Sequence, residues 1–287
     1  MEDINKIKED LIQQLENIRA INAEEELAYE RKYLAFRNLR WIPVFTNLIP
    51  KNSVVFRTRT HNNENLFNNR FEISNPPNKI ITKFARLNRP FQSVFYGSEN
   101  RPTSYMELVE YWAEEKEIGE EISVSIGMWE FQRDINVMII PRPNKEDRIT
   151  DAEIEYGNRY DRFLANGKFN EIGKVLSDMI FDFMSKEYMR PAKKDKATYT
   201  TTTAYSNLIM LREDIDGILY PSVPFGGNGY NLALRKNLVE NGDIKLIEVT
   251  KDSFTIGETD NGKHHFLQTD SKTSIAVNQE TGEISWE

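Results

Sequence analysis

The sequence predicts an α+β protein, with helices and strands in separate stretches of the chain. Apolar residues recur at three- and four-residue steps near the N-terminus and again between residues 150 and 212, which is the spacing of amphipathic helices. Shorter stretches rich in β-branched and aromatic residues end in Gly, Pro or Asn, as strands do. With 287 residues, 39% of them hydrophobic, the chain can bury a substantial core.

Residues 3–38 are expected to form two helices, broken at Asn22-Ala23, with Asn22 and Glu25 resembling a capping box. Their apolar stripe is not a sustained heptad repeat. It therefore favours docking on the main domain over pairing with a partner helix.

The stretch from Phe84 to Glu107 predicts a strand, a turn and a helix in quick succession, with the helix over roughly 102–116. Such a strand-to-helix connection places Arg86, Tyr96 and Glu107 around one cleft. The alternatives are that Glu107 is one more surface acid and that Tyr96 is an ordinary core residue.

Residues 53–60 alternate as a strand, with Phe56 on one face and Arg57 and Arg59 together on the other. Two buried arginines need an anionic partner, whereas on an edge strand they form a solvated basic face. The Asn-rich residues 61–79 that follow are expected to form a lid or cleft wall.

A Gly-rich loop at 221–230 holds Ser222. The other expected elements are strands at 121–127, 136–141 and 216–220, helices at 150–166, 168–187 and 197–212, and a meander of short strands from 243 onward with turns at 260–262 and 280–282.

Charge is unevenly distributed in a chain whose net charge is −8. Residues 51–101 carry nine basic and three acidic side chains, whereas residues 102–130 carry one basic and eight acidic ones. A basic island in an acidic protein suits a small anionic ligand and argues against direct nucleic-acid or membrane binding. The alternative is that these charges only pair across neighbouring surfaces. No apolar stretch is long enough to cross a membrane, so a cytoplasmic protein is expected.

Several kinds of site are disfavoured. The absence of cysteine excludes thiolate chemistry. His61, His264 and His265 do not form the pattern of a catalytic triad or a metal site, so no metal is expected. The glycines at 226–229 lack the Lys-Ser/Thr of a phosphate-binding P-loop.

Arginines, an aromatic residue, a carboxylate and a hydroxyl are together what an enzyme needs to act on a dinucleotide without metal. Arginines bind pyrophosphate, an aromatic ring stacks on a base, and a carboxylate stabilises positive charge at an anomeric carbon.

Four motifs carry a resemblance to a known family. They are Phe-Arg-x-Arg at 56–59, Ala-Arg-Leu-Asn at 85–88 followed by Val-Phe-Tyr ending at Tyr96, Thr-x-x-x-Glu at 103–107, and the run from Asp216 to Leu234. The sequence resembles RES-domain proteins, the toxins of RES–Xre toxin–antitoxin systems, over roughly residues 50–236.

The N-terminal helices at 1–48 and the β-meander tail at 241–287 lie outside the resemblance, and they flank an expected catalytic domain at 49–240 that contains a helical insertion. The resemblance implies an ADP-ribosyltransferase-like split mixed β-sheet. It implies NAD⁺ as substrate, no cofactor, cleavage of the nicotinamide–ribose bond by water or inorganic phosphate, and an Xre-type antitoxin partner. The added segments leave open whether inhibition instead works in cis.

The resemblance also implies residue roles. Arg86 grips the pyrophosphate or a phosphate nucleophile, Tyr96 lines the nicotinamide pocket, Glu107 steadies the oxocarbenium-like ribose, and Ser222 binds the nicotinamide ribose or amide. Arg57 or Arg59 adds phosphate contacts, and Asn88 and Tyr220 line the substrate site. The alternatives are an ADP-ribosyltransferase that modifies a macromolecule and a catalytically silent binding module.

Overall fold

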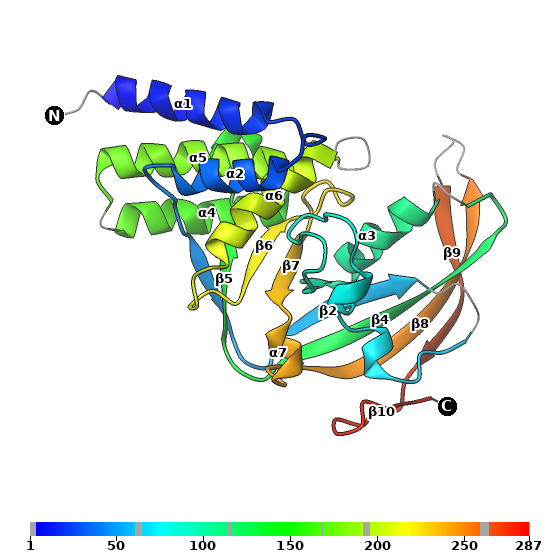
Figure 1. The fold of residues 1–287 in the computed structure, drawn as a ribbon. Coiled ribbons are helices and arrows are strands. Elements are labelled where there is room, and N and C mark those ends of the chain that lie inside the picture. The colour runs from blue at the N-terminus through cyan, green and yellow to red at the C-terminus, as the bar shows by residue number, and fades with distance from the viewer. Residues whose placement is uncertain are drawn as a thin grey trace. The chain divides into compact units, whose positions relative to one another are not determined.

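The computed structural model describes residues 4–60, 65–113, 116–167, 169–191, 196–258 and 264–286, which form two compact units (Figure 1). Unit 1 comprises Met1–Leu48, Pro76–Val94 and Asn136–Ala233; unit 2 comprises Ile49–Asn75, Phe95–Ile135 and Leu234–Glu287. Each unit is built from three separate stretches of chain and is described by itself. The predicted division at residues 48 and 240 stays a prediction.

Unit 1 contains a group of helices: α1 (Ile4–Ala20), α2 (Ala28–Arg37), α4 (Asp151–Asn166), α5 (Glu171–Met189) and α6 (Lys196–Ile209). Helix α5 contacts α1 and α6, and α2 packs along α6. Leu11, Leu15 and Ile18 form the buried stripe of α1, at the helical spacing seen in the sequence. Docking of the N-terminal helices on the rest of the chain is confirmed.

The strands of unit 1 lie in the order β1 (Thr46–Ile49), β5 (Ile135–Ile139), β6 (Gly217–Pro221) and β7 (Tyr230–Arg235). Strands β5 and β6 are parallel, with Val137 paired to Gly217, so the chain must cross over between them, and it does so through α4, α5 and α6. Strand β6 is buried along its whole length, with α5 packed on it.

Local side chains cap the N-termini of α4 and α5 but not that of α2. Helix α4 begins with a capping box between Thr150 and Glu153, and α5 begins with the Asn170 side chain accepting from the Gly173 N–H. The predicted break after α1 is confirmed, but the Asn22 cap is wrong. Helix α2 begins only at Ala28, after Leu27 in a left-handed conformation with φ 61°.

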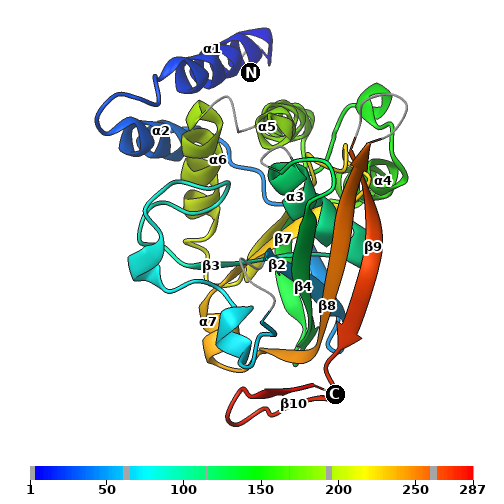
Figure 2. The ribbon, with the colours of Figure 1, turned by 90° about the vertical axis from the view of Figure 1, so that its right-hand side faces the viewer.

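Unit 2 is an antiparallel arrangement in the order β3 (Val94–Ser98), β2 (Val54–Thr60), β4 (Glu121–Phe131), β8 (Ile244–Glu258) and β9 (His264–Thr273) (Figure 2). Helix α3 (Arg101–Ala113) packs on β2. The smaller elements are a 3₁₀ turn at Arg70–Glu72, α7 (Asn237–Glu240) and the pair β10 (Ala276–Val277) and β11 (Ile284–Ser285).

The C-terminal strands correct one prediction. We expected short strands, but β8 has 15 residues and pairs with β4 from Glu121–Thr255 to Phe131–Ile244. The tail therefore belongs to the sheet of unit 2. The predicted turn at 280–282 is present, with Gly282 at φ 77°, whereas 260–262 and the start of the Asn-rich loop at 61–64 lie outside the described residues.

The α+β class is confirmed, since helices and both parallel and antiparallel strand pairs occur. Within the described ranges, no helix is both long and apolar enough to cross a membrane.

Candidate functional site

The eight predicted site residues divide evenly between the units. Unit 1 holds Arg86, Asn88, Tyr220 and Ser222, and unit 2 holds Arg57, Arg59, Tyr96 and Glu107. Convergence of all eight on one substrate stays a prediction, and each group of four has its own geometry.

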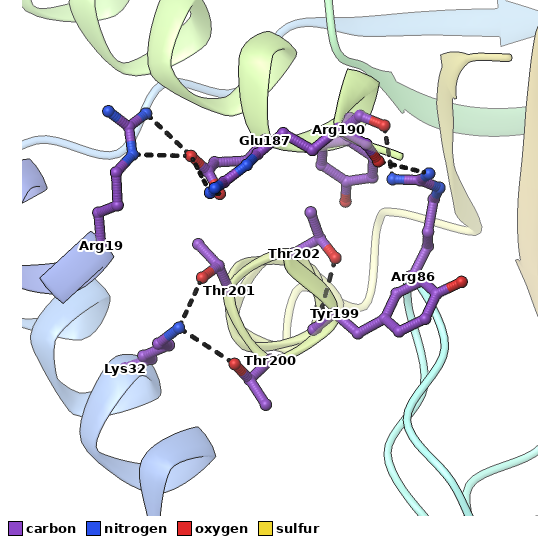
Figure 3. Close-up of polar contacts among 10 residues, drawn as sticks. Arg19, Lys32, Arg86, Glu187, Arg190, Tyr199, Thr200, Thr201 and Thr202 are labelled. Carbon is purple, nitrogen blue, oxygen red and sulfur yellow. Dashed lines mark hydrogen bonds and ion pairs between the residues drawn. The ribbon is translucent and has the colours of Figure 1, made fainter. Parts of the chain in front are cut away.

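Arg86 is buried in unit 1 at the C-terminal end of α5 (Figure 3). Its Nη1 donates to the main-chain oxygen of Tyr188 at 2.6 Å and its Nη2 to that of Arg190 at 3.0 Å. Carbonyls at a helix C-terminus lack partners within the helix and carry partial negative charge, so a guanidinium is favoured there. The ring of Tyr199 lies 5.9 Å from the Arg86 guanidinium carbon.

The same end of α5 is held from α1. Glu187, whose side chain is 1% exposed, accepts from Arg19 Nε at 2.9 Å and from Arg190 Nη1 at 3.1 Å. In Figure 3 these contacts run from Arg19 through Glu187 and Arg190 to Arg86. The carbonyls that bind Arg86 therefore belong to a firmly anchored helix end.

Tyr188 contacts another predicted site residue besides Arg86. Its ring packs against that of Tyr220 with centroids 5.2 Å apart, and Ser222 follows Tyr220 by two residues at the end of β6. Burial raises the pKa of Tyr188, although the nearby Arg86 cation and a hydrogen bond with Ser206 oppose this. The phenol is therefore neutral at physiological pH. Arg86 and Tyr220 thus contact the same buried tyrosine, through its main-chain oxygen and its ring respectively.

Ser222 opens a tight loop and is fully buried. Its N–H donates to the Gly229 oxygen at 2.8 Å, its carbonyl accepts from the Gly227 N–H at 2.8 Å, and its Oγ accepts from the Phe225 N–H at 3.3 Å. These bonds fix the direction of the serine side chain.

The N-terminus of α4 supports this loop. Thr150 Oγ1 donates to the Gly227 oxygen at 2.7 Å, and the buried Glu153 forms an ion pair with Arg142 at 2.7 Å. Gly227 has φ 82°, and a Cβ added there would clash with the Glu153 carboxylate. Helix α4, which we read from sequence as part of an insertion, is thus in direct contact with the Ser222 loop.

Asn88 is buried and shapes the loop that carries Arg86. Its carbonyl accepts from the Ala85 N–H at 2.9 Å, and the Ala85 oxygen in turn accepts from Thr203 Oγ1 at 2.7 Å. The turn that holds Arg86 is therefore tied to α6.

In unit 2, Arg57 and Arg59 project from the same face of β2, as predicted. Arg57 donates to the oxygens of Ile73 at 3.0 Å and Tyr96 at 2.6 Å, and Arg59 donates to the Glu72 oxygen at 2.7 Å. Burial, and secondarily the Arg59 cation, lower the pKa of Arg57; burial also lowers that of Arg59. Within the described ranges neither guanidinium is in an ion pair with a carboxylate.

Tyr96 and Glu107 lie on the other side of β2. Phe56 pairs with Ser98, so Tyr96, two residues before Ser98, is on the Phe56 face. Helix α3 covers that face, because the hydroxyls of Ser104 and Thr58 are hydrogen-bonded. Unit 2 therefore places Tyr96 and the helix of Glu107 on one side and both arginines on the other.

Glu107 is half-buried on α3. Ser104 and Tyr105 point toward the sheet, with the Tyr105 hydroxyl hydrogen-bonded to Asp252 on β8. Successive residues turn by about 100° around a helix, so Glu107 emerges on the flank turned away from β8. A carboxylate in this position can face a ligand on the β2–β3 side of the helix.

Among the described residues, no cluster of three or more histidines, aspartates or glutamates could hold a metal ion. His61 and the side chain of His264 fall outside the described residues.

The supporting residues Tyr188, Thr150, Glu153 and Asp252 were not predicted. Only the Thr150–Glu153 spacing gave a local signal, that of a capping box. The others depend on contacts across the chain that no short motif records.

The sequence matches the model of the RES domain over residues 54–243, more than half of the chain, and the chain therefore belongs to the RES domain family. The match contains all eight predicted site residues but excludes α1, α2 and the strands β8 and β9. A comparison with curated proteins returned no match. Among solved structures the chain is similar to the M. tuberculosis MbcT–MbcA toxin–antitoxin complex, with 12% identity, a TM-score of 0.36, and coverage of 70% of this chain and 85% of that chain.

Proposed function

We propose that this protein is an NAD⁺-consuming enzyme that cleaves the nicotinamide–ribose bond, with water or inorganic phosphate as the nucleophile. The observation that carries the proposal is the RES-domain match, because it spans every residue of the predicted site. In the cell the activity is that of a toxin or defence effector, restrained by an Xre-type antitoxin.

The reaction breaks the bond between the anomeric carbon and the nicotinamide nitrogen, and nicotinamide leaves as a neutral molecule. Water then gives ADP-ribose and a proton, whereas phosphate gives ADP-ribose 1″-phosphate. Positive charge builds on the ribose as the bond breaks, and the Glu107 carboxylate stabilises it electrostatically. Glu107 acts as an anion in this role, so it needs no raised pKa.

The other roles are divided between the units. In unit 2, Tyr96 lies on the α3 side of β2 and lines the nicotinamide pocket. In unit 1, Ser222 is held in a rigid loop and binds the nicotinamide ribose or amide, while Arg86 provides a fixed cation for the pyrophosphate or for a phosphate nucleophile. The resemblance gives Arg57 or Arg59 a further phosphate contact. Because both donate to main-chain oxygens, at 73, 96 and 72, from the face of β2 opposite the Tyr96 side chain, we assign them instead to supporting the site.

Incubation of the purified protein with NAD⁺, with and without phosphate, tests the proposal by chromatography of the products. We expect free nicotinamide together with ADP-ribose or its 1″-phosphate. The Glu107→Ala variant should lose turnover by about a hundredfold or more while keeping its thermal unfolding transition, because one electrostatic contact to the transition state is lost.

Other outcomes would contradict the proposal. Transfer of label from NAD⁺ to a macromolecule would identify an ADP-ribosyltransferase instead. Intact NAD⁺ after prolonged incubation under both conditions would indicate a binding module, and a fully active Glu107→Ala variant would remove Glu107 from the mechanism.

A further inference from the structure

The C-terminal strands β8 and β9 lie outside the RES-domain match, yet they form part of the sheet of unit 2. Strand β8 pairs with β4 along the whole length of β4, and β9 covers the other edge of β8 (Figure 2). Without these strands, β4 would lose the partner on one of its two edges. This segment is therefore more than an appendage to the sheet.

A buried carboxylate links β8 to the helix of Glu107. Asp252, 3% exposed, accepts hydrogen bonds from the Tyr105 hydroxyl, from Gln268 Nε2 at 3.1 Å and from Ser271 Oγ at 2.6 Å. A buried carboxylate is stable only when donors satisfy its oxygens, and here β9 provides two of them. The third comes from α3.

Tyr105 is held by its ring as well as by its hydroxyl. The ring meets Phe254 of β8 edge-on, with centroids 5.7 Å apart and an interplanar angle of 87°. This is the geometry that aromatic quadrupoles prefer. Two separate contacts thus join one side chain of α3 to β8.

Ser104 and Tyr105 together fix the rotation of α3. Ser104 is hydrogen-bonded to Thr58 on β2, and Tyr105 reaches β8, with β4 lying between these two strands. Neighbouring helical residues point about 100° apart, so contacts to two non-adjacent strands allow only one rotation of the helix. Glu107 follows by two residues, and its direction is set by the same contacts.

We propose that Tyr105 and Asp252 are positioning residues for Glu107. Through their hydrogen bond, strands β8 and β9 hold α3 in the rotation that directs the Glu107 carboxylate toward the substrate. The inference rests on the proposed function of Glu107, and it makes residues outside the RES-domain match necessary for turnover. Tyr105 and Asp252 act through α3 and do not touch the substrate.

The test compares steady-state NAD⁺ cleavage by the full chain and its variants. Tyr105→Phe removes the hydroxyl and keeps the ring, and Asp252→Ala removes the acceptor. Each should lower kcat by about ten- to a hundredfold, because misplacing a catalytic group by about 1 Å costs this much. The KM should change by about twofold or less, since ground-state binding is untouched. Both substitutions remove the same Tyr105–Asp252 hydrogen bond, so the kcat of the double variant should be no lower than that of the slower single variant.

Ser253→Ala is the matched control. Ser253 is the next residue on β8 and is similarly buried. Its Oγ is hydrogen-bonded to that of Ser123 on β4 at 2.9 Å, and among the described residues it has no hydrogen bond to α3. We expect its kcat to equal that of the parent. Wild-type kcat in Tyr105→Phe and Asp252→Ala, or an equal loss in Ser253→Ala, would overturn the inference.

Hydrogen exchange separates this inference from the proposed function. In Tyr105→Phe the amides of α3 should exchange faster, while those of β2 and β4 keep their protection. This readout does not require NAD⁺ turnover. A parent protein that leaves NAD⁺ intact would refute the proposed function alone, whereas unchanged exchange in α3 would refute the anchoring whatever the activity.

Discussion

The two units hold their predicted site residues by different means. In unit 1, Arg86 and Ser222 are buried and bonded to main-chain atoms of a helix end and a tight loop. In unit 2, Tyr96 and Glu107 are half-buried and take their positions from strand register and from neighbouring side chains. Substitutions at the unit 1 residues should therefore change both the free energy of unfolding and the kinetics of NAD⁺ cleavage. Substitutions at the unit 2 residues can change the kinetics without changing the stability.

Arg86→Ala should have the largest effect. It removes two charge-assisted hydrogen bonds to main-chain carbonyls, each worth about 1.5–3 kcal/mol, so the free energy of unfolding should fall by about 3–6 kcal/mol. The KM for NAD⁺ should also rise, since the cation for the pyrophosphate is gone. Chemical denaturation and steady-state kinetics measure the two effects.

Arg37→Ala is the control, because Arg37 is an exposed arginine of the same unit. It should alter neither quantity. A raised KM in Arg86→Ala at unchanged stability would break the contrast between the units, because Arg86 would then act on substrate without supporting the fold.

The glycines of the Ser222 loop sharpen the contrast. Gly227→Ala should lower the free energy of unfolding by about 2–3 kcal/mol, because φ 82° is unfavourable for alanine and the new Cβ would clash with buried Glu153. Gly226→Ala faces open space at φ 59° and should cost only about 1 kcal/mol. Equal losses in thermal or chemical unfolding would show that the Glu153 contact does not constrain the loop.

In unit 2 the two faces of β2 should respond differently. Tyr96→Ala should raise the KM for NAD⁺ about tenfold, because it removes an aromatic wall of the proposed pocket. Arg59→Gln, on the opposite face, should leave kcat and KM within about twofold of the parent. Steady-state kinetics compares them, and an Arg59→Gln defect as large as that of Tyr96→Ala would place substrate on both faces.

Much of the fold was accessible from sequence where the signal is local. Helical periodicity located α4, and alternation placed Arg57 and Arg59 on one face of β2. The length of β8 was missed because pairing with a distant strand leaves little trace in the strand itself. The left-handed Leu27 that precedes α2 was missed because leucine rarely adopts this conformation.

The candidate site, like the fold, could be predicted from sequence only in part. Local patterns pointed to six of the eight candidates, and the resemblance to RES-domain proteins added Asn88 and Tyr220 and the roles of all eight. Neither could show that Arg86 binds the end of α5 or that Glu153 and Asp252 are buried. Whether a charged side chain is buried depends on partners brought from far along the chain, and Asp252 reads in sequence as an ordinary surface acid. Motifs therefore identified the candidates, and long-range contacts determine how they are held.

The smallest expected effect concerns acid stability in unit 1. Asp161 forms a bidentate pair with the buried Arg148, with distances of 2.9 and 2.8 Å, and hydrogen bonding from that guanidinium lowers the pKa of Asp161. A carboxyl group with a lowered pKa in the folded state adds stability above its unfolded pKa of about 3.9, and this is lost as pH falls through the folded pKa. The parent should therefore lose about 1 kcal/mol or less from this pair between neutral and strongly acidic pH, because the carboxylate is partly solvated.

Asp161→Asn isolates this contribution. The variant should be less stable than the parent at neutral pH, and the difference should shrink toward zero in acid as the parent carboxyl becomes protonated. Arg148 also donates to the Arg142 oxygen at 2.8 Å, and Arg142 pairs with the Glu153 that supports the Ser222 loop, so the loss should extend to hydrogen exchange in that loop. Denaturation curves at neutral and acidic pH measure the difference. A gap that stays constant with pH would mean that the Asp161 charge does not contribute to holding unit 1 together.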